Sequence, residues 1–331
     1  MSSVLERPPA APPADAPPSR VQRVVANKRM LVVTTVLAVL LVYGMVTTDG
    51  FATVDNGRAI LAAIAITGFG ALGATLVMLG GNLFSMSASV TAAGAAMVFL
   101  AALQYGVVVA LVAALLAGAG AYALQGFAIG AWGANPIVVT IGAGSLQAAV
   151  AIMITDGSSV RVAPEVTSYK FLADTVLGIP VGVYLLLVVA ALLHLLLTRT
   201  VWGRNLYFLG KSPPAAYAAG LPVVLTTVIA FAIAGACTGF AGVVQAASTQ
   251  SATINDLGTL TFDAVAAAVV GGNAIAGGRG SIPRTLLGVL VIATLGDLLL
   301  LRDYSAGVRL LATGLLVIVF VFATSSKEQA R

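Results

Sequence analysis

Seven uncharged polar side chains stand inside otherwise apolar stretches of this chain and are the ones that could bind a ligand. They are Asn82, Ser85, Gln104, Gln125, Gln147, Gln245 and Asn273. Amide and hydroxyl groups both donate and accept hydrogen bonds, so together they suit an uncharged polyol. Hydrogen bonding between neighbouring helices explains such residues equally simply, and both interpretations stay open at this stage.

Two of these residues follow glycine pairs. Gly80-Gly81 precedes Asn82, and Gly271-Gly272 precedes Asn273. Glycine-interrupted apolar segments are places where a helix breaks and exposes backbone groups to a ligand. We therefore predict a helix break at each pair.

The residue sets that catalysis or metal binding requires are absent from the sequence. Cys237 is the only cysteine and His194 the only histidine, so the sequence predicts no metal site and no Ser/His/Asp set. Gly210-Lys211-Ser212 matches the end of the phosphate-binding motif G-x-x-x-x-G-K-S/T, but Asn205 replaces the first glycine and no buried strand precedes it. We predict no bound cofactor and no nucleotide site in this chain.

Composition places the chain in a membrane. Of 331 residues, 59% are hydrophobic and 9% are charged, against roughly 25% charged in soluble domains. Residues 59–155 contain no Asp, Glu, Lys, Arg or His, and a helix needs about 20 apolar residues to span the hydrocarbon core. The apolar stretches are continuous rather than alternating, which favours a polytopic all-α helical bundle over a β-barrel.

We expect about ten membrane spans, with the third and eighth short or broken by glycine. The predicted spans are 30–48, 59–79, 84–102, 105–127, 136–155, 176–198, 223–246, 262–278, 284–301 and 306–323. With both termini cytoplasmic, five of the 17 Lys and Arg residues fall outside and the other twelve inside. That bias obeys the positive-inside rule, so the +5 net charge indicates topology rather than nucleic-acid binding.

The ends of the chain differ from its middle. Residues 1–29 hold six of the 13 prolines, interleaved with alanine, and are predicted to be a disordered cytoplasmic tail. Residues 30–324 form the predicted membrane domain and 325–331 a short cytoplasmic tail. The outer loop 156–174 is polar enough to meet a soluble partner, although a merely solvated loop is an equal possibility.

A short helix is predicted in the cytoplasmic loop 199–222. Ser212 suits the N-cap, Pro213 the first turn and Gly220 the position after the last turn, with four alanines between them. A helix of two turns needs a surface to pack on. Docking into a partner's groove and lying on the lipid surface both remain open from the residues alone.

Four motifs in order resemble the ribose-type sugar ABC transporter permeases. They are 135–142 (NPIVVTIG), 200–210 (TVWGRNLYFLG) with the alanines that follow, 262–273 (FDAVAAAVVGGN) and 277–288 (GGRGSIPRTLLG). The resemblance runs from about residue 50 to the end of the chain.

The resemblance implies a bacterial inner-membrane permease of about ten helices for a monosaccharide. Its implied partners are a second permease chain, a cytoplasmic subunit that binds and hydrolyses ATP, an extracytoplasmic solute-binding protein, and the membrane lipid around the permease. The implied coupling residues are Arg204, Ser212, Pro213, Ala215, Ala216, Ala219 and Gly220. Branched-chain amino acid and nucleoside permeases are more distant relatives, and an independent secondary transporter is a further alternative.

A tentative solute path follows from the same motifs. It consists of Asn82, Phe84, Ser85, Asp263 and Asn273, with Asp263 expected to cap or gate at an outer helix end rather than to bind. The family's Gly-Gly-Ile-Asp-Leu-Ser-Val-Gly stretch is altered here, since Leu83 replaces the acidic residue and Ser87 the later glycine. Either the solute differs from an ordinary pentose or hexose, or the chain pairs with a different permease that keeps the acidic motif.

Overall fold

The computed structural model describes residues 20–162, 166 and 169–325, and within them the chain is almost entirely helical. The helices are α1 (Arg20–Thr47), α2 (Val54–Leu79), α3 (Ala88–Ala102), α4 (Val107–Trp132), α5 (Pro136–Thr155), α6 (Val181–Arg199), α7 (Val201–Lys211), α8 (Pro213–Ala218), α9 (Val223–Thr249), α10 (Leu260–Val270), α11 (Ile282–Leu301) and α12 (Ala306–Ser325). Two 3-10 turns, η1 (Leu103–Tyr105) and η2 (Lys170–Leu172), and four two-residue strands complete the described chain.

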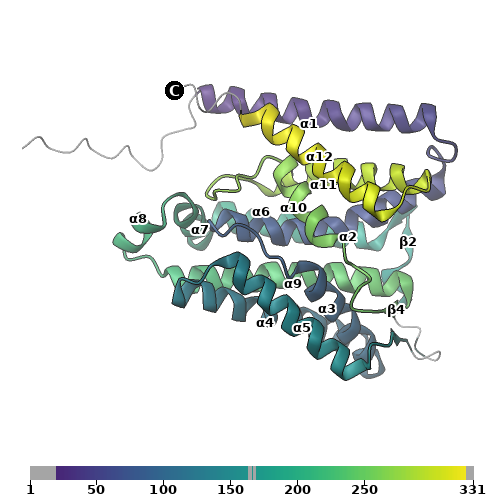
Figure 1. The fold of residues 1–331 in the computed structure, drawn as a ribbon, viewed down its shortest axis with the longest axis horizontal. Coiled ribbons are helices and arrows are strands. Elements are labelled where there is room, and N and C mark those ends of the chain that lie inside the picture. The colour runs from purple at the N-terminus through teal and green to yellow at the C-terminus, as the bar shows by residue number, and fades with distance from the viewer. Residues whose placement is uncertain (1–19, 163–165, 167–168, 326–331) are drawn as a thin grey trace, which may run out of the picture.

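The long helices lie side by side along one common direction (Figure 1). Eight of the described helices are long and apolar enough to cross a membrane, and the apolar segments Leu260–Val270 and Ala306–Phe322 are shorter. Together they account for the ten predicted spans, and the predicted all-α bundle is confirmed. The start of α1 and the end of α12 lie at the same end of the bundle as α7 and α8, and the strands lie at the other end (Figure 1).

Several predicted boundaries were wrong. The third span becomes helical only at Ala88 instead of 84, and the helix of the eighth ends at Val270 instead of 278, because the chain is non-helical after each glycine pair. The first helix begins at Arg20, ten residues inside the tail predicted to be disordered. Residues 1–19 and 326–331 lie outside the described chain.

A whole helix, α7, was missed within the loop predicted to hold only one. Thr200 caps it, its hydroxyl accepting from the backbone N of Gly203 at 3.1 Å. Two glycines and an asparagine lower its helix propensity, so the sequence suggested a loop. Its buried face, which includes Leu206 and Leu209, packs on the bundle and stabilises it.

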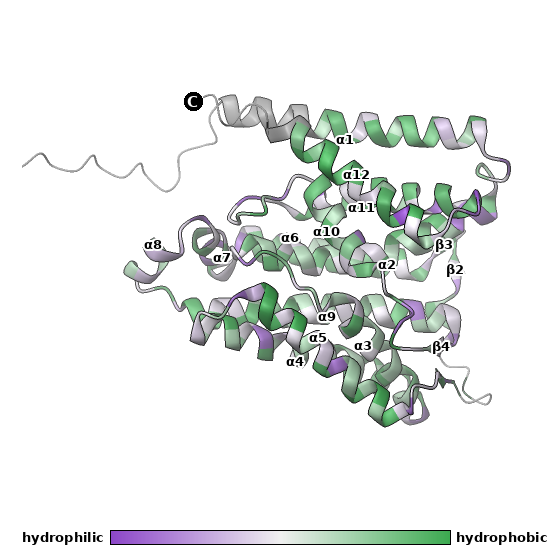
Figure 2. Cartoon of the chain, viewed as in Figure 1, coloured by the Kyte–Doolittle hydropathy of each residue, from purple (hydrophilic) through white to green (hydrophobic). Residues whose placement is uncertain are grey.

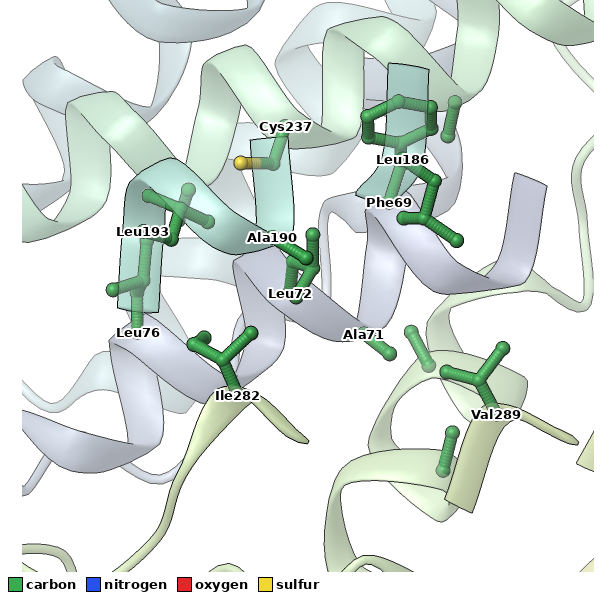
Figure 3. Close-up of a cluster of buried hydrophobic side chains, with 14 of the residues drawn as sticks. Phe69, Ala71, Leu72, Leu76, Leu186, Ala190, Leu193, Cys237, Ile282 and Val289 are labelled. Atoms are coloured by element: carbon green, nitrogen blue, oxygen red, sulfur yellow. The ribbon is translucent and has the colours of Figure 1, made fainter. Parts of the chain in front are cut away.

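The core surrounds α2, which packs on α6, α9 and α11 (Figure 3). Phe69, Leu72 and Leu76 of α2 are fully buried. Side chains from the three neighbouring helices close around them, including Leu186 of α6 and Ile282 of α11 (Figure 3). The outer surface is the reverse of a soluble protein's, because large apolar side chains line it along α1, α4, α5 and α12 (Figure 2). Such a surface suits contact with lipid.

Backbones approach closely where α4 crosses α9. A Cβ placed on Gly118 would lie 2.5 Å from the carbonyl oxygen of Gly235, and one placed on Gly235 would lie 2.2 Å from that of Gly118. Small residues allow such contacts, which drive helix association in lipid because no hydrophobic effect operates there. By contrast, a Cβ on Gly120, in the same helix, would meet nothing within 4 Å.

Arg302 fastens α1, most of whose surface is exposed, to the rest of the bundle. Arg302 directly follows α11 in the chain. Its guanidinium donates to the Thr48 hydroxyl at 2.9 Å and to the Tyr43 hydroxyl at 3.1 Å. It also lies 5.0 Å from the centroid of the Tyr43 ring, a cation–π arrangement. These polar contacts join two helices that otherwise meet through few buried side chains.

We predict that Gly118→Ala destabilises the purified protein by roughly 1–3 kcal/mol, because the new methyl group overlaps the Gly235 carbonyl. Gly120→Ala serves as the matched control and should leave the melting temperature unchanged or slightly raised. Thermal unfolding in detergent measures both. Equal melting temperatures for the two variants would contradict the crossing.

Candidate functional site

Both glycine pairs end a helix inside the bundle. Gly81 and Gly272 have φ of +79° and +88°, a conformation that L side chains rarely adopt. At the end of α10, the N–H of Gly272 donates to the Val269 carbonyl at 2.8 Å and that of Asn273 to the Ala268 carbonyl at 3.1 Å. This pair of bonds is a Schellman motif. The non-helical residues 80–87 and 271–281 are called the first and second break segments below.

The first break segment makes α3 begin inside the bundle, where its free backbone N–H groups need partners. Side chains supply them. The N–H of Met86 donates to the Thr140 hydroxyl of α5 at 3.1 Å, and that of Ser89 to the Thr261 hydroxyl of α10 at 2.9 Å. Hydroxyl groups from two distant helices therefore replace the helical hydrogen bonds that the break removes.

A buried polar cluster lies on the same segment. The Ser85 and Ser87 hydroxyls lie 2.9 Å apart, and the Oε1 of Gln125 on α4 lies 3.0 Å from the Ser87 hydroxyl and 3.4 Å from that of Ser85. The two hydroxyl protons form two of these three hydrogen bonds at a time. All three side chains are buried, and the Nε2 of Gln125 has no hydrogen-bond partner among the described residues. The sequence pointed to Ser85 and Gln125 separately; only the fold brings them together.

Asn273, on the second break segment, is fully satisfied within the protein. Its Nδ2 donates to the hydroxyls of Thr285 at 2.7 Å and Thr75 at 3.2 Å, and its Oδ1 accepts from the backbone N of Ser281 at 3.0 Å. In this conformation Asn273 therefore ties α2, α11 and the second break segment together, instead of facing a solute. Thr75 and Thr285 escaped the sequence analysis because threonine is common in apolar helices.

Asn82 and Phe84 of the predicted path differ from Asn273 in their surroundings. Asn82 is half-buried, and no hydrogen bond of its side chain is found in the described part of the chain. Phe84 packs against Met78, Ala268 and Val269, a small apolar cluster formed by α2 and α10. The first break segment thus carries one half-buried amide and one aromatic ring that packs on α2 and α10.

Two carboxylates lie toward the end of the bundle that carries the strands. Asp263 is half-buried in the first turn of α10, where the charge of Arg309 on α12 acts on it. Asp297 of α11, which the sequence analysis did not single out, is buried and accepts from the Nδ2 of Asn56 at 3.0 Å. A charged residue within a predicted span was the available signal for it.

Three backbones converge at the α7 end of the bundle through glycines. A Cβ on Gly210 would lie 2.0 Å from the Leu79 carbonyl oxygen and 2.5 Å from the N of Gly278, and one on Gly277 would lie 2.5 Å from the Cα of Gly81. The N–H of Gly278 also donates to the Leu79 carbonyl at 3.1 Å. This glycine junction joins the C-terminal end of α7 to both break segments.

Tyr207 of α7 adds a side-chain link to the second break segment. Its hydroxyl donates to the backbone carbonyl of Gly280 at 3.0 Å. Burial raises the pKa of Tyr207 above its ordinary value, and the nearby charge of Arg284 opposes that rise. The hydroxyl therefore stays protonated at neutral pH and remains a donor.

The short helix α8 follows directly and is exposed on all sides but one. The Ser212 hydroxyl accepts from the N of Ala215 at 3.4 Å, as the predicted N-cap requires, and Gly220 has a φ of +69°. Ala216 is fully buried against Leu209 and Val223. Ala216 thus anchors α8 to the protein, while the other α8 residues and Ala219 after them stay exposed.

Two small sheets and a polar hollow close the opposite end. The strand Val160–Arg161 pairs with Ser251–Ala252, and Thr175–Val176 pairs with Ile179–Pro180. An open hollow of about 370 Å³ lies beside the first sheet, lined by residues that include Arg161, Lys170, Gln250 and Ser251. Glu165 of the predicted outer loop lies outside the described residues.

A multi-pass helical bundle whose uncharged polar groups gather at two breaks inside it defines a membrane permease. Residues 58–323 match the family described as the branched-chain amino acid transport system permease component, and the chain belongs to that family. The predicted resemblance to ribose-type sugar ABC transporter permeases is confirmed.

Relatives match over most of their length. The D-allose transport system permease protein of Escherichia coli is 30% identical over 295 residues, covering 86% of this chain and 88% of the relative. The ribose import permease protein of Haemophilus influenzae is 28% identical over 296 residues, covering 87% and 90%. The L-arabinose transport system permease protein of Escherichia coli is 26% identical over 298 residues, covering 89% and 90%.

A solved structure shares the fold. It is a metal-chelate type ABC transporter in an inward-facing conformation, with a TM-score of 0.50 and 17% sequence identity. The match covers 90% of this chain and 99% of the other. At that identity the likeness concerns the fold alone.

We predict that Asn273→Ala lowers the free energy of unfolding by about 2 kcal/mol, because buried threonine hydroxyls and a backbone N–H lose their partner. Asn82→Ala, which follows the other glycine pair, is the control and should change it by less than about 0.5 kcal/mol. Denaturation in detergent compares the two. A destabilised Asn82 variant beside an unaffected Asn273 variant would reverse the assignment.

Proposed function

We propose that this chain is the permease subunit of an ATP-driven importer and forms the path for a monosaccharide or related polyol. The observation that carries this proposal is the family match over residues 58–323, together with relatives named for allose, ribose and arabinose. The neutral side chains at the first break segment support it, because hydroxyl and amide groups pair with sugar hydroxyls without requiring a charge.

Several partners complete the proposed importer. A cytoplasmic subunit binds and hydrolyses ATP, a solute-binding protein delivers the sugar outside, and a second permease chain, identical or different, lines the other side of the path. The chain itself holds no cofactor in this proposal and catalyses no reaction. The exposed hollow beside Arg161 and Lys170 offers the solute-binding protein a polar surface.

Coupling to ATP is proposed to pass through α8. Its exposed side chains, Pro213 and Ala215 among them, present a short, small-residue surface to the ATP-hydrolysing subunit, with Arg204 of α7 nearby in the chain. The glycine junction supports this role, because the backbone of Gly210 is in close contact with both break segments and α7 cannot move without displacing them. A shift of α8 is therefore expected to move both.

The proposed location is the bacterial inner membrane, with both termini and α8 in the cytoplasm. The positive-inside count supports this orientation. The shared end of α1, α8 and α12 fits it, because ten crossings return the chain to the side on which it starts (Figure 1).

Reconstitution tests the function. Proteoliposomes that hold the purified importer complex should take up at least one of D-allose, ribose and L-arabinose in the presence of ATP, and not with a non-hydrolysable analogue. Uptake of a branched-chain amino acid or a nucleoside instead would transfer the assignment to the alternative permeases. Solute flux by this chain alone, without ATP, would establish the secondary-transporter alternative.

We predict that Ala215→Glu on the exposed side of α8 lowers ATP-dependent uptake by about tenfold or more, since a loss of 1.4 kcal/mol in coupling corresponds to a factor of ten. Its melting temperature should match that of the wild-type protein. Ala216→Glu is the contrasting variant: it buries a charge and should lower the melting temperature itself. Normal uptake by the Ala215 variant would remove α8 from the coupling surface.

A further inference from the structure

The Gln125 amide is the one buried side-chain amide in the described chain that lacks a partner for its nitrogen. Buried polar groups are nearly always hydrogen-bonded, and each exception calls for an explanation. Turning the amide end for end does not remove the exception. The two serine hydroxyls pair with either end, since they donate and accept, and the opposite end is then left alone.

The unpaired amide stands in a setting built for hydroxyl groups. Ser85 and Ser87 hold its other end, and the Tyr122 hydroxyl, one turn earlier on α4, lies among Ser85, Ser87 and Thr238. None of these groups carries a charge. A neutral ligand with neighbouring hydroxyls can replace the serine contacts and satisfy the free end of the amide at once.

The site is closed in this conformation. Ser85 and Tyr122 border a cavity of about 10 Å³ between the first break segment and α10, which holds about one water molecule. A monosaccharide needs more space, so one wall has to move. The residues that line the cavity belong to the break segment, α2, α3, α4 and α10. Helix α5 does not line it but covers another side of the break segment.

Helix α5 packs on the break segment with few buried residues of its own. Its only two buried residues are Thr140 and Gly144. Thr140 accepts from the N–H of Met86 at 3.1 Å, and a Cβ on Gly144 would lie 3.4 Å from that of Ser87. Withdrawal of α5 would break the Met86–Thr140 hydrogen bond and the bond from the Thr91 hydroxyl of α3 to the Gln147 Oε1 at 2.8 Å. It would uncover the side of the segment that carries the two serines.

We propose that Ser85, Ser87 and Gln125 form a hydroxyl-binding subsite for the transported polyol, which α5 covers through Thr140 and Gly144. The proposal rests on the proposed importer function and names the residues that select the solute inside the membrane. A pair of neighbouring hydroxyls fits it: one takes the place of a serine on the Gln125 oxygen, and the other accepts from the nitrogen.

The test uses Gln125→Met in the complete importer, reconstituted in proteoliposomes with its solute-binding protein saturated. Uptake is measured for the sugar that the wild-type importer transports and for its singly deoxygenated analogues. We expect Gln125→Met to slow uptake of the parent sugar by about tenfold, the effect of about one lost hydrogen bond to a bound hydroxyl. For one analogue the wild-type and variant rates should become equal, which a purely structural role would not produce.

Gln104→Met is the matched control, because that amide is exposed at η1 and already donates to the Ala101 carbonyl at 3.3 Å. It should keep the wild-type preference for the parent sugar. If Gln125→Met fails to assemble, Ser87→Ala replaces it with the same expectation.

A Gln125 or Ser87 variant that transports the parent sugar at the wild-type rate, with unchanged preference over every analogue, overturns the subsite. Failure of the wild-type importer to move any monosaccharide instead overturns the proposed function, and the subsite with it.

Discussion

Hydrocarbon offers no hydrogen-bond partner to a backbone amide, yet two crossings of this chain are only partly helical. The rest of the bundle is arranged around that problem. Hydroxyls of Thr140 and Thr261 receive N–H groups near the start of α3, and the Leu79 carbonyl that ends α2 accepts from Gly278. Because helices from both halves of the sequence supply these partners, each break fixes its neighbours, and irregular backbone is tolerated only where protein surrounds it.

The two breaks look alike in sequence and differ in what they do. After the second, Asn273 spends all its hydrogen-bonding capacity on Thr75, Thr285 and Ser281, so the segment is locked to α2 and α11. After the first, the Asn82 side chain makes no hydrogen bond among the described residues. That segment contacts α5, which has few buried residues, through the bond from Met86 to Thr140. The asparagine therefore fastens the second break to its neighbours and does not fasten the first.

Glycines pack α7 tightly against the two break segments. Where Gly81, Gly210 and Gly277 meet, the backbones are too close for any side chain between them. Close-packed contacts transmit displacement because they have no free volume to absorb it. Helix α7 therefore links the exposed α8 to the polar interior by backbone contact, and the buried Ala216 keeps α8 attached to that link.

The membrane class, the bundle, the number of crossings and the two breaks followed from the sequence, because the length of an apolar run and a glycine pair are local signals. Helix α7 did not, since its low propensity is outweighed by packing against the bundle. The hydrogen-bond partners of the buried polar residues did not follow from the sequence either. Asn273 finds Thr75, 198 positions away, whereas Gln125 finds two serines for its oxygen and no partner for its nitrogen among the described residues. Which buried amide is paired and which is left free depends on contacts between distant segments, and only the tertiary structure decides those.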